Sequence, residues 1–348
     1  MNFNESYNNS FQESNLTIVS YKIYVVSAVT LLIIGLFGFV LNLIAIKLMW
    51  KNKQLWTSVN AILFNLVCGD FLVSIFGIPL TLASAIAQGW IFGKSLCLAY
   101  GFFMSVLGIG AIITLTTLSL ERYLIITKPF RNASLTRHGV YILILGIWLY
   151  SLLLTVPPLI GWGNYINEGI NISCSVNWED RSYNSKTYVI FLFIFGLIIP
   201  LLIISYSYIN IIRKLQKKTT KSKQIKRREK RIASVIFLMI TAFLIAWTPY
   251  AVMALLIQFG SENIITPSLT VIPALMAKSS ICYNPIIYVA LNTQFQQPFK
   301  QIFGKSQSPT DHGVTTSLHA DTHVATERKS EPAEIRELTV SVDVNDMH

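Results

Sequence analysis

Charged residues are scarce in this chain. Only 13% of its 348 residues are Asp, Glu, Lys or Arg, whereas 53% are hydrophobic. A soluble domain carries about 25% charged residues, so this composition excludes an ordinary soluble protein and predicts an integral membrane protein. The sequence also lacks the alternating segments of roughly ten residues that build membrane β-barrels. Because helices and closed barrels are the structures that span a bilayer, we expect helical spans.

Acidic residues are especially few, and the net charge of +11 is concentrated in one segment. Between Arg213 and Arg231 there are eleven basic residues and one acid, Glu229, so this segment alone supplies 11 − 1 = +10. The charge is therefore a property of one loop rather than of a basic groove, and we expect no nucleic-acid partner. A polybasic loop beside a membrane span is suited to contact with anionic lipid.

Cysteine is rare too, since the chain has four, which allow three pairings. Cys68 and Cys282 fall within apolar segments, where a free cysteine behaves as a small buried apolar residue. Cys97 and Cys174 lie at the ends of such segments. The choice of pairing then depends on the topology of the chain.

The N-terminus lacks a cleavable signal pattern. Residues 1–20 are polar and rich in Asn and Ser, without a basic n-region. We therefore expect the first span to act as its own insertion signal. Three glycosylation sequons, at Asn4, Asn8 and Asn15, indicate an exported N-terminal tail over residues 1–22.

Seven apolar segments are present, each long enough for an α-helix that crosses a bilayer, which needs roughly 20 residues. They cover residues 23–49, 58–87, 96–124, 139–161, 187–212, 232–258 and 267–291. We therefore predict an all-α fold, a seven-transmembrane helix bundle over residues 23–291.

The basic residues between the spans predict the orientation, because loops rich in Lys and Arg stay in the cytoplasm. The first, third and fifth loops are basic, whereas the opposite loops hold Glu168, Glu179, Asp180 and Glu262. This pattern places the N-terminus outside the cell and the C-terminus in the cytoplasm, in agreement with the sequons. A fourth sequon, at Asn132, falls on the cytoplasmic side and is interpreted as chance.

Two segments follow the seventh span. Residues 292–304 carry Phe295, Phe299, Ile302 and Phe303 at helical spacing, which favours a short amphipathic helix in the membrane interface. Residues 305–348 are polar, contain many Ser and Thr, and show no apolar periodicity. We expect them to form a disordered cytoplasmic tail.

One lysine lies near the middle of the seventh span. A charged Lys at the centre of a membrane helix costs roughly 2.5–3.5 kcal/mol, so Lys278 needs a partner, a neutral form or a covalent role. A desolvated amine loses its proton readily and can condense with an aldehyde to form a Schiff base. The alternative is a lysine paired with a nearby acid in a transporter or channel, and position alone does not decide between them.

An ordered set of motifs runs through the spans. It comprises Asn42, Asn65-Leu-Val-Cys-Gly-Asp70, Glu121-Arg122-Tyr123, Trp148, Trp247-Thr-Pro249-Tyr250 and Asn284-Pro285-Ile-Ile-Tyr288. Together these residues resemble the rhodopsin-like G-protein-coupled receptors over about residues 25–303. Within that family a lysine six residues before the last motif, here Lys278, marks the opsins.

Two further stretches are similar to particular opsins. Asn292-Thr-Gln294 resembles the tripeptide of ciliary opsins, and Cys174-Ser-Val-Asn-Trp178 resembles the encephalopsin, multiple-tissue and invertebrate ciliary group. The resemblance implies that Lys278 binds retinal covalently as a protonated Schiff base. The retinal would be 11-cis in the dark and all-trans after light.

A protonated imine in a low-dielectric site needs a carboxylate nearby. The position that holds this counterion in vertebrate visual opsins, three residues after the cysteine of span three, is Tyr100 here. Resemblance to other opsins implies Glu168 as the counterion, and the alternative is a solvated loop glutamate. Asp70 is interpreted as a structural node with Asn42 and Asn284.

The topology places Cys97 and Cys174 on the oxidising outer side, where a disulfide would hold the loop over span three. The resemblance also implies a retinal pocket. Its predicted residues are Tyr100, Gly108, Phe193, Phe243, Trp247 and Tyr250. Aromatic stripes at helical spacing are alternatively plain core packing.

The resemblance further implies an activation switch. Its predicted residues are Glu121, Arg122, Glu229, Asp70, Asn284, Pro285 and Tyr288. Arg122, paired with Glu121 and Glu229, would hold the sixth span until retinal changes shape. Alternatively, Arg122 is a snorkelling arginine at a span end. The expected partners are a heterotrimeric G protein of the inhibitory or transducin-like class, arrestin and a receptor kinase at the tail, and membrane lipid.

We therefore predict a light-sensing receptor of the cell membrane rather than an enzyme, with no catalytic or metal site. Tyr100 together with Glu168 resembles the bistable opsins, whose photoproduct keeps its retinal. One alternative is a retinal photoisomerase that binds all-trans retinal in the dark and exports the 11-cis form. The other is a diffusible-ligand receptor or a transporter in which Lys278 binds an anion.

Overall fold

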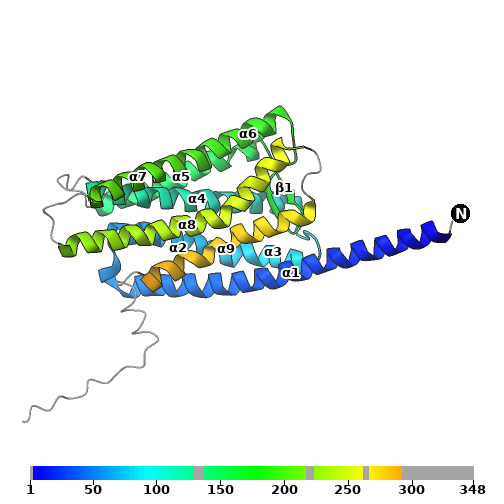
Figure 1. The fold of residues 1–348 in the computed structure, drawn as a ribbon, viewed down its shortest axis with the longest axis horizontal. Coiled ribbons are helices and arrows are strands. Elements are labelled where there is room, and N and C mark those ends of the chain that lie inside the picture. The colour runs from blue at the N-terminus through cyan, green and yellow to red at the C-terminus, as the bar shows by residue number, and fades with distance from the viewer. Residues whose placement is uncertain (1–2, 128–135, 217–222, 262–265, 292–348) are drawn as a thin grey trace, which may run out of the picture. The chain divides into compact units, whose positions relative to one another are not determined.

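The computed structural model describes residues 3–127, 136–216, 223–261 and 266–291, with side chains from residue 21 onward except at residues 223, 225 and 226. The predicted interfacial helix (292–304), the tail (305–348) and the side chains of the N-terminal sequons lie outside this part. The described residues form a bundle of helices with a two-stranded hairpin at one end (Figure 1).

Seven helical spans account for most of the described residues, each long and apolar enough to cross a membrane. In chain order the elements are α1 (Phe3–Lys51), η1 (Lys53–Leu55), α2 (Ser58–Leu72), η2 (Val73–Gly77), α3 (Ile78–Ile86), α4 (Gly93–Thr127), α5 (Arg137–Thr155), η3 (Pro157–Ile160), β1 (Tyr165–Glu168), β2 (Ser173–Val176), α6 (Tyr183–Phe193), η4 (Ile194–Ile198), α7 (Ile199–Gln216), α8 (Lys223–Phe259) and α9 (Pro267–Leu291). The predicted fold class is confirmed.

Three helix ends differ from the predicted spans. Helix α1 begins at Phe3, well before the predicted start at residue 23, and α8 begins at Lys223, inside the basic segment. Helix α5 ends at Thr155 instead of continuing to residue 161, because Pro157 and Pro158 open a 3₁₀ turn. Proline removes a backbone donor and clashes with the preceding turn, so it stops the α-helix here.

Two spans are each interrupted by a π-helical segment, which hydropathy does not reveal. Segment η2 lies within the second span, and η4 lies within the fifth. Each is followed within two residues by a proline, Pro79 or Pro200, whose missing donor disturbs the regular hydrogen-bond ladder. Val73 of η2 and Leu197 of η4 line the central cavity described below.

The hairpin lies across one end of the bundle, which we call the hairpin end. Strands β1 and β2 are antiparallel, with Asn167 opposite Cys174 and Glu168 opposite Ser173. The Tyr165 ring packs on α4 at Gly101, where a Cβ would lie 2.9 Å from Tyr165 Cδ1. Tyr165 donates a hydrogen bond to the Thr155 carbonyl over 2.7 Å, and burial raises the pKa of Tyr165 to about 12. The tyrosine is therefore a neutral donor that fixes the hairpin.

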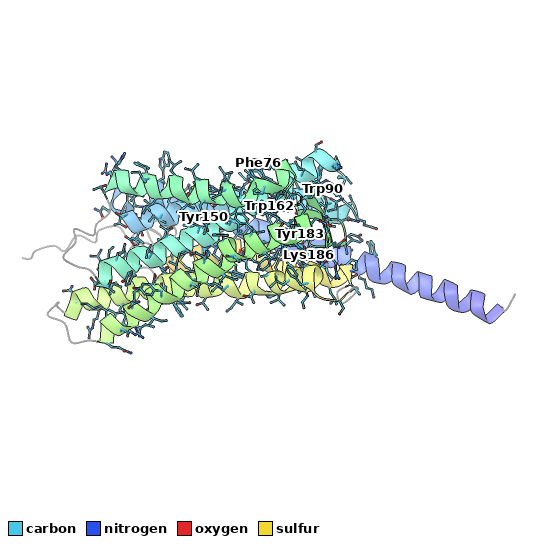
Figure 2. All side chains as sticks on the ribbon, turned by 90° about the horizontal axis from the view of Figure 1, so that it is seen from above. Phe76, Trp90, Tyr150, Trp162, Tyr183 and Lys186 are labelled. Atoms are coloured by element: carbon cyan, nitrogen blue, oxygen red, sulfur yellow. A yellow bond between two sulfur atoms is a disulfide. The ribbon has the colours of Figure 1, made fainter. Side chains whose placement is uncertain are left out.

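Aromatic side chains gather at the hairpin end. Figure 2 shows Trp90, Trp162, Tyr183 and Lys186 near that end, while Tyr150 lies farther along the bundle. Such amphipathic rings are typical of the interface between a membrane and water.

Toward the opposite end the helices close around an apolar core. It includes Leu66, Leu115, Ile211 and Met239, each at most 2% exposed.

Candidate functional site

A cavity of about 430 Å³ lies inside the bundle beneath the hairpin. All six residues predicted to form a pocket line it, namely Tyr100, Gly108, Phe193, Phe243, Trp247 and Tyr250. Glu168 and Lys278 line it as well. The structure therefore brings the predicted pocket, the predicted counterion and the predicted attachment lysine to one cavity. Its size falls within the roughly 300–1,000 Å³ of small-molecule pockets.

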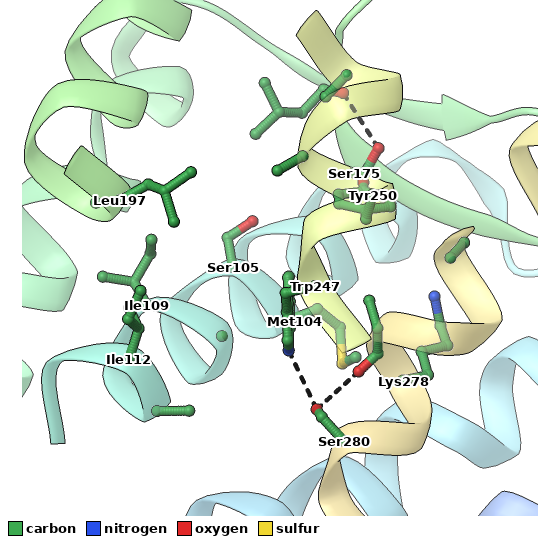
Figure 3. A pocket seen from close by; sticks show the side chains of 18 of the residues that line it. Met104, Ser105, Ile109, Ile112, Ser175, Leu197, Trp247, Tyr250, Lys278 and Ser280 are labelled. Atoms are coloured by element: carbon green, nitrogen blue, oxygen red, sulfur yellow. Dashed lines mark hydrogen bonds between the residues drawn. The ribbon is translucent and has the colours of Figure 1, made fainter. Parts of the chain in front are cut away.

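Lys278 projects from α9 at the edge of the cavity (Figure 3). In the described part of the chain its amine makes no hydrogen bond and no ion pair, and no oxygen of Glu168 lies within 4.0 Å of it. Both residues also border a second, smaller cavity of about 20 Å³. An amine without an acid against it differs from the paired lysine of the transporter alternative, and it is accessible to a ligand in the cavity.

Glu168 ends strand β1 and is held by a partner on another element. The Tyr250 hydroxyl of α8 donates a hydrogen bond to Glu168 Oε1 over 2.6 Å. Trp178, just after β2, donates from its indole Nε1 to the Tyr250 oxygen over 3.1 Å. Glu168 is therefore a partly buried, hydrogen-bonded side chain at the cavity rather than a solvated loop residue.

Trp247 of α8 lines the cavity and contacts α9. Its ring stacks on Phe243 with centroids 5.5 Å apart, and its Nε1 donates to Ser280 Oγ over 3.1 Å (Figure 3). Gly108 of α4 faces the other edge of the ring, where a Cβ would lie 2.9 Å from Trp247 Cη2. The indole is thus fixed on three sides, so a ligand that presses on it acts on both α8 and α9.

Tyr100 stands where the vertebrate-type counterion would be. It is 3% exposed, and its hydroxyl lies 2.6 Å from Thr81 Oγ1. The disulfide predicted between Cys97 and Cys174 is present and ties α4 to strand β2. Because β2 pairs with β1, this bond also fixes the position of Glu168 over the cavity.

Asp70 also lines the cavity, but its carboxylate is hydrogen-bonded to a residue of α9. Its Oδ2 accepts a hydrogen bond from Asn284 Nδ2 over 2.9 Å, which joins α2 to α9. Asn42 does not reach Asp70 directly, and instead donates to the Ile281 carbonyl over 3.0 Å. Together these bonds join α1, α2 and α9, an arrangement that fits the interpretation of Asp70 as a structural node.

The predicted switch residues lie toward the opposite end of the bundle. Arg122 Nε donates to Glu121 Oε2 over 2.7 Å, and the two side chains are buried, at 5% and 4% exposed. Tyr288 is buried as well, at 1% exposed. The pairing of Arg122 with Glu229 stays a prediction. The burial of Arg122 differs from that of a snorkelling arginine, whose head group would be exposed to solvent.

Sequence reasoning missed three residues that hold the site together. In the sequence Trp178 is only a point of resemblance to other opsins, and no pattern there predicts its hydrogen bond to Tyr250. Ser280 and Thr81 are not among the residues that the sequence predicts, although each hydroxyl contacts a predicted pocket residue. For Ser280 a signal existed, since it lies two residues after Lys278 in the same span.

Comparison with known proteins agrees with this geometry. The family model of the seven transmembrane receptors of the rhodopsin family matches residues 41–288. A Gq-coupled rhodopsin of Mizuhopecten yessoensis is 35% identical over 81% of this chain and 60% of its own length. A pinopsin of Columba livia is 32% identical over 84% of each chain. The chain spans about 60% of the length of several of the curated relatives that it matches.

A solved structure shows the same arrangement. The crystal structure of squid rhodopsin superposes with a TM-score of 0.76 at 31% identity, covering 81% of this chain and 86% of that one. The region that the family model matches contains the cavity, the disulfide and the motifs of six of the seven spans. The chain therefore belongs to the opsins of the rhodopsin family of seven transmembrane receptors.

Proposed function

We propose that this opsin binds retinal through Lys278, uses Glu168 as the counterion and activates a heterotrimeric G protein in response to light. One observation carries the proposal: the Lys278 amine and the Glu168 carboxylate face the same largely apolar cavity. An aldehyde bound there would meet the one described lysine that lines the cavity, with a carboxylate on the adjacent wall.

The residues present fit a retinal group. A polyene makes no hydrogen bonds along its length, and the cavity offers aromatic and aliphatic walls from α4, η4, α8 and α9. When bound, retinal would supply the absorption of light and a change of shape, from 11-cis to all-trans. The roles of the protein are to attach it, to balance its charge and to respond to its shape.

Lys278 and Glu168 divide the first two of these roles. The amine forms the imine bond and carries the resulting positive charge, which a site of low dielectric disfavours without an anion. Glu168 supplies the anion, and its hydrogen bond from Tyr250 keeps the carboxylate directed at the cavity. The disulfide at Cys174 keeps the hairpin in place, so the negative charge does not swing out to solvent.

Trp247 is suited to sense the shape of the ligand. It contacts α4 at Gly108 and is bonded to α9 at Ser280, and Pro249 follows two residues later within α8. A ligand that presses on the indole would therefore push on α8 next to its proline kink. Movement of the far end of α8 would open the bundle beside Glu121 and Arg122, where a G protein binds.

The class of G protein that the sequence predicts differs from the class named for one relative. The sequence led us to expect the inhibitory or transducin-like class, whereas the name of the Mizuhopecten yessoensis relative states coupling to Gq. We propose coupling to a heterotrimeric G protein and a direct comparison of the two classes. Nucleotide exchange on purified Gi and Gq, with and without light, decides between them.

The proposal also covers the orientation of the bundle in the membrane and the role of the C-terminal tail. We propose that the hairpin end faces the exterior and the end with Arg122 faces the cytoplasm, as the basic loops predict. Receptor kinase and arrestin would act on the Ser- and Thr-containing tail, residues 305–348, which lies outside the described residues. Limited proteolysis from each side of sealed vesicles tests the orientation.

The test of the function is an absorption spectrum of the purified protein reconstituted with 11-cis retinal at neutral pH. We expect a visible band in the wild type, a near-ultraviolet band in Glu168→Gln and no covalently bound retinal in Lys278→Arg. Glu179→Gln, an exposed glutamate of the same loop that does not line the cavity, is the matched control and should keep the visible band. Absence of any band in the wild type would exclude a retinal receptor.

A further inference from the structure

Trp178 lies outside the set of residues that the proposed function uses directly. It follows strand β2, is 7% exposed and borders the cavity. Its ring contacts Phe193 of α6 and Tyr250 of α8, with centroids 6.3 Å and 6.2 Å apart. These two contacts fix the plane of the indole and therefore the direction of its N–H bond.

The indole starts a chain of two hydrogen bonds that ends on Glu168. Trp178 Nε1 donates to the Tyr250 oxygen over 3.1 Å, and the Tyr250 hydroxyl donates to Glu168 Oε1 over 2.6 Å. The chain leaves the hairpin after β2, crosses to α8 and returns to the hairpin at the end of β1. The hairpin thus contacts the same tyrosine at two points.

The direction of both bonds follows from the chemistry of the donors. An indole N–H only donates, so the Tyr250 oxygen must accept, and its single proton is directed to Glu168. An O–H···O distance of 2.6 Å falls in the range of about 2.5–2.7 Å for a bond to an ionised oxygen. Because linked hydrogen bonds polarise one another, donation by Trp178 strengthens the bond from Tyr250 to the carboxylate.

We propose that Trp178 is a positioning residue that sets the strength of the Glu168 counterion through Tyr250. The inference rests on the proposed function and deepens it, since it assigns a residue that regulates the charge facing Lys278. Trp178 makes no hydrogen bond to Glu168 in the described structure, so its influence passes through the tyrosine hydroxyl.

The expected consequence has a definite sign. Without the indole donor, the bond from Tyr250 weakens and more negative charge remains on the carboxylate oxygens that face Lys278. A stronger negative field beside a positive nitrogen stabilises the ground state of the bound retinal and raises its excitation energy. The visible band should therefore move to shorter wavelength.

The experiment replaces one N–H group and keeps the shape of the ring. 3-Benzothienylalanine, in which sulfur takes the place of the indole N–H, is incorporated at position 178 of the full-length protein, which is then reconstituted with 11-cis retinal. We expect a visible band shifted to shorter wavelength and only a small fall in Tm, as the loss of one hydrogen bond predicts. The control is the same replacement at Trp162, whose Nε1 donates to Thr187 Oγ1 over 2.9 Å and which does not line the cavity.

Two further measurements separate hydrogen bonding from packing. In a Tyr250→Phe background the replacement at 178 should produce no additional shift, because the group through which it acts is gone. In the protein without retinal, the infrared carboxylate stretch that Glu168→Gln removes should shift when position 178 is replaced. This second readout does not depend on bound retinal.

Each other outcome overturns the inference. A band at the wild-type wavelength, or an equal shift in the Tyr250→Phe background, would show that Trp178 only packs. These results would leave the proposed function intact, since the wild type and Glu168→Gln would still differ. Absence of a visible band in the wild type would instead defeat the proposed function and this inference together.

Discussion

Gly108 of α4 lies directly against the Trp247 ring of α8. A Cβ at position 108 would be 2.9 Å from Trp247 Cη2, closer than real side chains approach one another. The ring has little freedom to withdraw, because it stacks on Phe243 and bonds to Ser280. We predict that Gly108→Ala destabilises the retinal-free protein by about 1–3 kcal/mol, as overpacking does, and slows retinal uptake.

The neighbouring Gly110 supplies a matched control for this prediction. A Cβ there would lie 3.5 Å from Trp148 Cζ3, an ordinary contact, and Gly110 does not line the cavity. Gly110→Ala receives the same gain in helix propensity, so the difference between the two variants isolates the clash. Thermal unfolding and the rate of growth of the visible band measure both effects. Equal behaviour of the two variants would contradict a role for the Gly108 contact.

The disulfide between Cys97 and Cys174 should be essential for stability. It joins residues separated by 77 positions and fixes the hairpin that carries Glu168. We predict that Cys97→Ser costs about 2–5 kcal/mol of unfolding free energy, measured by thermal or denaturant unfolding. Cys68→Ser, which removes a free cysteine, is the control and should cost less. A variant as stable as the wild type would show that hairpin contacts alone hold the loop.

The buried pair of Glu121 and Arg122 should restrain activity in the dark. Removing one partner of a buried ion pair typically costs about 3–5 kcal/mol, because the other charge stays buried. We therefore predict that Glu121→Gln lowers Tm and raises nucleotide exchange on the G protein without light. Tyr206→Phe, which loses a long, exposed contact with Tyr123, should leave dark activity unchanged. Dark activity equal to the wild type in Glu121→Gln would argue against a latch.

Bistability, which the sequence predicts, can be tested by chromophore extraction. Tyr100 occupies the vertebrate-type counterion position and is bonded to Thr81, so Glu168 on the hairpin would carry the counterion role alone. We predict that the illuminated protein keeps all-trans retinal bound and returns to its first spectrum under a second wavelength. Release of free retinal within minutes would contradict bistability. Binding of all-trans retinal in the dark and release of the 11-cis form would favour the photoisomerase alternative.

Much of the fold was predictable because hydropathy encodes the spans directly. The seven spans, the disulfide and the position of Lys278 follow from apolar length, loop charge and one lysine in an apolar segment. The π-helical segments were not predictable in the same way. They depend on how Pro79 and Pro200 shift the hydrogen-bond ladder within a packed bundle, which composition does not specify.

The candidate site likewise has residues that the sequence predicts and contacts that it does not. The sequence motifs identify Trp247, Tyr250 and Lys278 because each lies at a fixed spacing within a span. The link from Trp178 through Tyr250 to Glu168 depends on the hairpin register and on the distance between the hairpin and α8. Such contacts join residues about 70 to 80 positions apart, and no local pattern marks them.

Asp70 is the rival for the counterion role, because it also lines the cavity. Its carboxylate is already bonded to Asn284, at 2.9 Å, so we expect it to act on the helices rather than on retinal. Asp70→Asn removes the charge and keeps an oxygen that can accept from Asn284, and we predict that its visible band stays in place. Asp70→Ala leaves the Asn284 amide without this acceptor and should cost about 1–3 kcal/mol of stability. A near-ultraviolet band in Asp70→Asn, together with an unchanged band in Glu168→Gln, would transfer the counterion role from the hairpin to α2.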